Sequence, residues 1–172
     1  MKLDSDDFEL FATERRFAQS LPALDARWKA LQSEVHPDRF AAEGPAARRV
    51  ALQWAMRVNE AYERLKDPLK RAAYLCELNG APVSADENSS MPPGFLVQQL
   101  EWREALDAAT AQPVVEHLAA DVAEQRRAAL TRLETFLDVD RDYKRAAQEV
   151  RILMFIERFA HDVERRLDAL EQ

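Results

Sequence analysis

The strongest constraint on the fold of this chain is a pair of apolar stripes on either side of a polar turn. Side chains three or four residues apart share one face of a helix, and both stripes keep this spacing. Their members are Leu24, Trp28, Leu31 and Val35 before the turn, and Val50, Trp54, Val58, Ala61 and Leu65 after it. Because each stripe has to be buried, we expect helices over 23–35 and 46–66 that pack face to face as an antiparallel hairpin.

The turn at the tip of this hairpin has the sequence Val35-His36-Pro37-Asp38-Arg39. Proline lacks an N–H group and keeps the residue before it out of the helical region, so the first helix is expected to end at Val35 or His36. An imidazole, a carboxylate and a guanidinium then lie next to one another on a rigid, exposed connection. Such a cluster favours docking on the polar surface of another protein.

The rest of the chain is expected to form further helices separated by one linker. A short helix from Leu69 to Leu78 is ended by Asn79-Gly80, which is typical of a left-handed helix cap. Residues 81–94 hold three of the eight prolines and many small polar residues. Three helical patterns with short connections follow, over 95–109, 114–137 and 142–170, and they imply an antiparallel three-helix bundle. The sequence thus predicts an all-α protein with an N-terminal domain over 1–77, a linker over 78–94 and a C-terminal domain over 95–172.

The composition agrees with a soluble, helical protein of the cytoplasm. The 172 residues include only 3 Gly and 8 Pro, with 47% hydrophobic and 32% charged residues. The single cysteine, Cys76, excludes an intrachain disulfide and a cysteine-rich zinc site, and it fits a reducing compartment. No apolar run approaches the length of a membrane span, so neither secretion nor a membrane partner is expected.

The charge is distributed unevenly along the chain. Residues 1–77 carry 13 Lys and Arg against 13 Asp and Glu, whereas residues 78–172 carry 11 against 18. The net charge of −7 therefore belongs to the second half. An acidic surface repels nucleic acid, so we expect a protein partner with a basic or mixed surface there and no nucleic-acid partner.

The helix that begins at Phe95 has two apolar faces. Trp102 and Leu106 each lie within roughly 20° of Phe95 on a helical projection, and these three residues form the expected core stripe. Leu96, Val97 and Leu100 point roughly 120° or more away, together with Glu101 and Glu104. In the last helix, Phe155 points roughly 100° from the mean direction of the core stripe. Either a neighbouring helix buries these residues or they form a partner-binding patch with a carboxylate edge.

Several motifs follow one another in the order found in a known family. They are His36-Pro37-Asp38-Arg39-Phe40, Val58-Asn59-Glu60-Ala61-Tyr62-Glu63-Arg64-Leu65 and Asp67-Pro68-Leu69-Lys70-Arg71-Ala72-Ala73-Tyr74. With these, the first 77 residues resemble a J domain, the module by which DnaJ-type co-chaperones engage an ATP-driven chaperone of the DnaK class. The run from Phe95 to Asp107 and the run Arg151-Ile152-Leu153-Met154-Phe155 resemble the first and last helices of the C-terminal domain of the HscB family, the J proteins of bacterial iron–sulfur cluster assembly.

This resemblance implies two protein partners and no cofactor. The protein would bind the cluster scaffold IscU, deliver it to the chaperone HscA and stimulate the ATPase of that chaperone. The implied chaperone-binding residues are His36, Pro37, Asp38 and Arg39, with Arg27 and Lys29 on the preceding helix. The implied scaffold-binding residues are Leu96, Val97, Leu100, Glu101, Glu104 and Phe155. Because Ser33 and Glu34 occupy positions near the tip where J domains usually carry cations, weaker electrostatic docking is expected.

Other classes of function have less support in the sequence. His117 and His161 have no metal-ligand spacing around them, and no phosphate-binding glycine loop is present, so neither an enzyme nor a metal site is expected. The proline-rich linker and the lack of sustained heptads disfavour a coiled-coil structural protein. A general J-domain co-chaperone with a different client remains the alternative.

Overall fold

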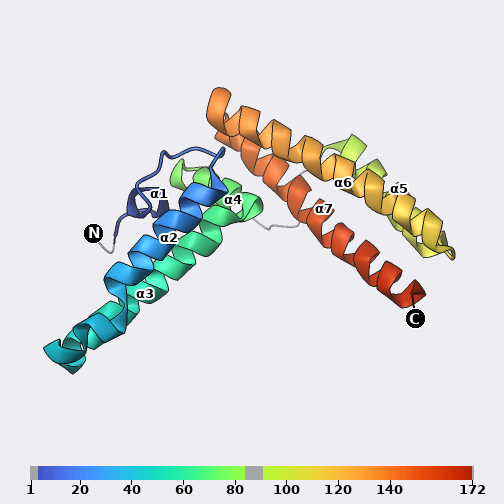
Figure 1. The fold of residues 1–172 in the computed structure, drawn as a ribbon. Coiled ribbons are helices and arrows are strands. Elements are labelled where there is room, and N and C mark those ends of the chain that lie inside the picture. The colour runs from blue at the N-terminus through green and yellow to red at the C-terminus, as the bar shows by residue number, and fades with distance from the viewer. Residues whose placement is uncertain (1–3, 84–90, 172) are drawn as a thin grey trace. The chain divides into compact units, whose positions relative to one another are not determined.

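The computed structural model describes residues 4–83 and 91–171, and within these ranges it consists of helices and their connections (Figure 1). The chain divides into two compact units, Met1–Leu75 and Cys76–Gln172. We call them the N-terminal unit and the C-terminal unit. The all-α fold predicted from the sequence is confirmed. The linker predicted over 78–94 includes residues 84–90, which lie outside the described residues.

The N-terminal unit is built around the hairpin of α2 (Leu21–Val35) and α3 (Pro45–Lys66), which lie side by side in Figure 1. The Ser20 side chain accepts a hydrogen bond from the Ala23 N–H and caps the start of α2. Pro45 begins α3, a position at which a backbone N–H would have no partner within the helix, so the missing N–H of proline costs no hydrogen bond. Between the two helices, residues Pro37–Glu43 form a 3-10 helix, η1, where the sequence predicts only a turn.

The apolar stripes of α2 and α3 form the core of the hairpin, but Trp28 and Trp54 are only half-buried and Val50 is exposed. Leu31, Val58 and Leu65 are fully buried. Val50, however, is 51% exposed, and Ala51 is buried in its place. The prediction for Val50 was wrong because a small rotation of the stripe near the start of α3 turns the adjacent residue inward.

The helices α1 (Asp7–Leu10) and α4 (Pro68–Leu78) close the other end of the hairpin. Phe8, Phe11 and Phe17 are buried as their apolar character predicts. Arg71 of α4 is also buried: its Nε donates to the Phe17 carbonyl at 2.7 Å and its Nη1 donates to the Leu65 carbonyl at 2.6 Å. A buried guanidinium with these carbonyl partners fixes α4 to the loop before α2 and to the end of α3.

The C-terminal unit contains α5 (Pro93–Ala108), α6 (Gln112–Glu134) and α7 (Tyr143–Leu170). The long helices α6 and α7 lie side by side in Figure 1, and α5 lies against the end of this pair that contains the start of α6. The largest buried side chains between the helices are Val115, Val122, Leu133, Val150, Leu153, Ile156, Phe159 and Val163. The arrangement confirms the predicted three-helix bundle.

The reversal between α6 and α7 is sharper than the sequence indicated. A π-helical turn, η2 (Thr135–Val139), extends α6, and the Asp140 N–H donates to the Thr135 carbonyl at 2.9 Å. Arg141 then adopts a positive φ of 51°. The Asp142 side chain caps α7 by accepting from the Arg145 N–H at 3.1 Å. One π turn and one left-handed residue therefore suffice to make the two long helices antiparallel.

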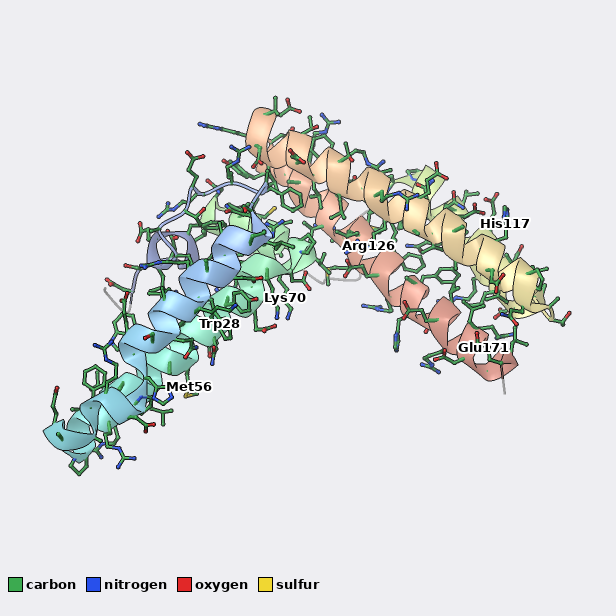
Figure 2. The ribbon with its side chains drawn as sticks, in the orientation of Figure 1. Trp28, Met56, Lys70, His117, Arg126 and Glu171 are labelled. Atoms are coloured by element: carbon green, nitrogen blue, oxygen red, sulfur yellow. The ribbon has the colours of Figure 1, made fainter. Side chains whose placement is uncertain are left out.

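Two ion pairs join α6 to α7. Arg126 lies on α6, is labelled in Figure 2, and its Nε donates to Glu157 Oε1 at 3.1 Å. Arg132 donates from Nε and Nη2 to Glu149 Oε1 at 2.9 and 2.7 Å. Glu149 is buried, so its pairing satisfies a carboxylate that would otherwise be costly to desolvate.

Candidate functional site

The turn at the tip of the hairpin is exposed and internally ordered. His36 ends α2 with extended backbone angles, φ −61° and ψ 128°, as the following proline requires. Its Nδ1 accepts a hydrogen bond from the Asp38 N–H at 3.3 Å, and this nitrogen lies 3.6 Å from Asp38 Oδ2. The two side chains remain 57% and 86% exposed. With Nδ1 used as an acceptor, the neutral imidazole carries its proton on Nε2, which is free to donate to a partner.

The neighbouring cations are placed differently from one another. Arg39 folds back on the helix before it, where its Nη1 donates to the Ser33 carbonyl at 3.0 Å. Lys29 is exposed, and Arg27 is half-buried. The two residues are two positions apart on α2, so they point roughly 160° away from each other. A partner that contacts the solvent-facing side of α2 would therefore meet Lys29 first.

A shallow hollow beside the turn was not predicted from the sequence. It is lined by Pro37, Pro45, Arg48, Arg49 and Leu52. Both arginines are exposed, and neither makes an ion pair within the described part of the chain. The signal that could have found them is the dipeptide Arg48-Arg49 in the first two turns of a helix that starts close to His36-Pro37-Asp38. These cations add positive charge on the α3 side of the turn.

The first helix of the C-terminal unit presents two different faces. Trp102 and Leu106 are only 4% and 5% exposed, and the Trp102 ring stacks on Phe159 with centroids 5.4 Å apart. On the opposite face, Leu96 is 46% exposed and Leu100 is 65% exposed. Val97, at 55%, extends the same surface. The neighbouring helices thus cover one face of α5 and leave the other in solvent within the described residues.

Phe155 of α7 lies at the edge between packing and solvent. Its ring makes an edge-to-face contact with Phe95 at 5.5 Å and stacks on Phe159 at 6.1 Å. It is half-buried rather than freely exposed. Phe95 begins the core stripe of α5 and directly precedes Leu96, so this contact places Phe155 at the first turn of α5. The five α5 residues of the sequence-predicted scaffold-binding set are all exposed, and Phe155 contacts the same helix through Phe95.

The carboxylates Glu101 and Glu104 border this apolar surface. Both are exposed and neither pairs with a cation among the described residues. An unpaired carboxylate at the rim of an apolar patch is available to a basic group of a partner. We call Leu96, Val97, Leu100, Glu101, Glu104 and Phe155 the α5 patch.

The described residues give little support for a metal site, a membrane span or a reactive thiol. Residues 4–83 and 91–171 contain no group of His, Cys, Asp and Glu arranged to hold a metal ion, and no helix there is both long and apolar enough to cross a bilayer. His117 lies on the outer side of α6, where Figure 2 labels it. Burial raises the pKa of the Cys76 thiol to about 11, which keeps it protonated and unreactive at neutral pH.

The chain has relatives along its whole length. A co-chaperone HscB homologue of Burkholderia multivorans is 49% identical over 174 residues, with 99% of each chain covered. The chain belongs to the HscB co-chaperone family. Residues 91–164 also match the family model described as the HSCB C-terminal oligomerisation domain.

Solved structures of HscB proteins share the fold. The chaperone HscB from Vibrio cholerae is 34% identical, with a TM-score of 0.83 over 96% of this chain and 99% of that one. The human co-chaperone protein HscB, 23% identical, superposes with a TM-score of 0.86 over 99% of this chain and 84% of that one, which is a likeness of fold. Because the chain belongs to the HscB family, the exposed turn and the α5 patch are its candidate sites for the binding of co-chaperone partners.

Proposed function

We propose that the protein binds the iron–sulfur scaffold IscU through the α5 patch, delivers it to the DnaK-class chaperone HscA and stimulates the ATPase of HscA through the His36-Pro37-Asp38 turn. The observation that carries this proposal is the presence, in one HscB-family chain, of two exposed features that its own packing leaves free. One is the ordered polar turn in the N-terminal unit, and the other is the α5 patch in the C-terminal unit. The protein would bind IscU and HscA in the cytoplasm, and HscA would be the protein that hydrolyses ATP.

The turn is suited to docking on a polar chaperone surface. The hydrogen bond from the Asp38 N–H to His36 Nδ1 orients the imidazole on the backbone of the turn before binding. Pre-ordering lowers the entropy lost on association. Arg39 lies in the turn, Arg48 and Arg49 lie on its α3 side, and Lys29 and Arg27 lie about two turns further back on α2. An acidic chaperone surface would therefore be attracted over a range of about 8 Å at physiological salt.

The α5 patch is suited to an apolar client surface with a basic edge. Its leucines and valine contribute roughly 1.5–3 kcal/mol for each side chain that the client fully covers. Glu101 and Glu104 contribute mainly to orientation and association rate, since rim charges are only partly desolvated. Because the three aliphatic side chains do not support the fold from inside, their role in binding can be separated from stability.

The proposal is tested with two variants of the intact chain. His36→Gln removes the imidazole acceptor and should abolish stimulation of the HscA ATPase, while affinity for IscU stays unchanged. The triple variant Leu96→Ala, Leu100→Ala, Phe155→Ala should weaken IscU binding at least about tenfold, because a loss of about 1.4 kcal/mol gives that factor. It should keep the basal stimulation that needs no scaffold. Calorimetric titration and steady-state ATPase assays give these quantities.

A matched control for the turn is His117→Gln, an exposed histidine on α6 that should leave both activities unchanged. Full ATPase stimulation by His36→Gln would overturn the role of the turn. Unchanged IscU binding by the triple variant would overturn the role of the α5 patch. If the chain stimulates a general DnaK-class chaperone better than HscA and does not bind IscU, it is a J-domain co-chaperone with a different client.

A further inference from the structure

Two arginines of α7 flank the aromatic residue of the α5 patch. Arg151 and Arg158 lie four residues before and three residues after Phe155, so all three are neighbours on the helix surface. Arg158 is exposed, and Arg151 is half-buried with no hydrogen-bond partner for its Nε among the described residues. Neither makes an ion pair within that part of the chain. The apolar surface therefore has a basic border on α7, opposite its acidic border on α5.

The charges between these two borders are already neutralised. Arg103 of α5 and Asp162 of α7 lie at the seam between the helices, where Arg103 Nη1 is 3.4 Å from Asp162 Oδ2. The Arg103 guanidinium also lies 5.5 Å from the centre of the Phe159 ring. Arg103 and Asp162 form an ion pair with each other. The charged groups that remain available to a partner are Glu101 and Glu104 at the α5 border of the apolar surface, and Arg151 and Arg158 at its α7 border.

We propose that the scaffold-docking surface is two-signed, and that Arg158 and Arg151 bind carboxylates of the scaffold while Glu101 and Glu104 bind its basic groups. The inference rests on the proposed function and adds the chemistry of the partner: an apolar patch with a cation on one side and an acidic group on the other. A surface with opposite charges on its two borders accepts such a partner in one orientation and repels the reversed one. The borders would thus fix how the scaffold is presented.

Charge reversal on α7 tests the inference. Arg158→Glu should weaken binding of purified IscU about fivefold at low salt, because an attractive rim pair becomes a repulsive one. The loss should shrink as salt rises and should lie mainly in the association rate. Arg151→Glu should act in the same direction. Arg127→Glu is the matched control, since it reverses an exposed arginine that points roughly 140° from the buried stripe of α6.

The outcomes separate this inference from the proposed function. If Arg158→Glu tightens binding, the scaffold surface is basic throughout, and the two-signed surface is wrong. If Arg158→Glu behaves like Arg127→Glu while Leu100→Ala still weakens binding, the α5 patch binds the scaffold without help from α7. If the unmodified chain does not bind IscU at all, the proposed function itself fails. If Arg158→Glu and Glu101→Lys each weaken the binding of IscU, the result supports a surface whose two borders bind groups of opposite charge on the scaffold.

Discussion

Asp7 is fully buried and holds the start of the N-terminal unit to the middle of α3. Its Oδ1 lies 2.7 Å from Arg57 Nη1, and its Oδ2 lies 3.1 Å from Arg64 Nη1. Its N–H donates to the Tyr74 hydroxyl at 3.1 Å, which ties α4 to the same point. Burial raises the pKa of Tyr74, so the hydroxyl remains protonated at neutral pH. Asp7 therefore connects α1 to α3 through its carboxylate and to α4 through its backbone N–H.

Replacing this carboxylate should be costly. Asp7→Asn leaves the two guanidinium groups without their counter-charge, and we expect the free energy of unfolding of the N-terminal unit to fall by about 3–5 kcal/mol. Urea unfolding followed by tryptophan fluorescence in a Trp102→Phe background reports this unit alone, because the other two tryptophans are Trp28 and Trp54. Glu9→Gln, an exposed change in the same helix, should cost less than about 0.5 kcal/mol. Equal losses of stability in the two variants would show that the ion pairs of Asp7 with Arg57 and Arg64 contribute no more than an exposed side chain does.

At the scale of single elements, α5 is the helix whose two faces serve different purposes. One face stacks Trp102 on Phe159, and the other exposes Leu100. A helix with apolar residues on both sides usually lies between two neighbours, yet the described residues cover only one side. Burial thus divides the side chains of α5 into those that maintain the bundle and those available to a partner.

Two alanine substitutions on α5 should therefore behave differently. Trp102→Ala removes a buried ring and should destabilise the C-terminal unit by about 3–5 kcal/mol. Leu100→Ala should change its stability by no more than about 0.5 kcal/mol. Hydrogen exchange of α6 and α7 amides, followed by mass spectrometry, measures the C-terminal unit separately from the N-terminal one. Comparable protection losses in both variants would mean that Leu100 supports the fold, and the α5 patch would then be a packing surface.

The elements were largely predictable because periodicity, prolines and caps act locally. The hairpin, the bundle and the buried face of α5 followed from spacing alone. Val50 was misplaced because a helical pattern does not specify which of two adjacent residues turns inward where the helix pair ends. The partial burial of Phe155 depends on its contact with Phe95, a residue sixty positions away on another helix. Asp7 gave no signal either, since its burial depends on two arginines that lie far along the chain.

At the scale of the whole molecule, the two proposed sites lie in separate compact units joined by one chain. The turn belongs to Met1–Leu75, and the α5 patch belongs to Cys76–Gln172. Under the proposed function, covalent connection of the units would raise the concentration of a bound scaffold near a bound chaperone. The advantage of the two-unit chain would then lie in tethering, which neither unit provides by itself.

Tethering predicts that the two defects cannot complement each other. The His36→Gln variant should bind the scaffold without engaging the chaperone, and the triple alanine variant of the α5 patch should have the opposite defect. An equimolar mixture should give only the basal, scaffold-independent ATPase stimulation, because each chain carries one working site and the scaffold is never held beside an engaged turn. Steady-state ATPase rates with and without IscU measure this. If the mixture recovers the scaffold-dependent enhancement of the unmodified chain, the two sites act on the chaperone independently and the connection between the units serves no delivery role.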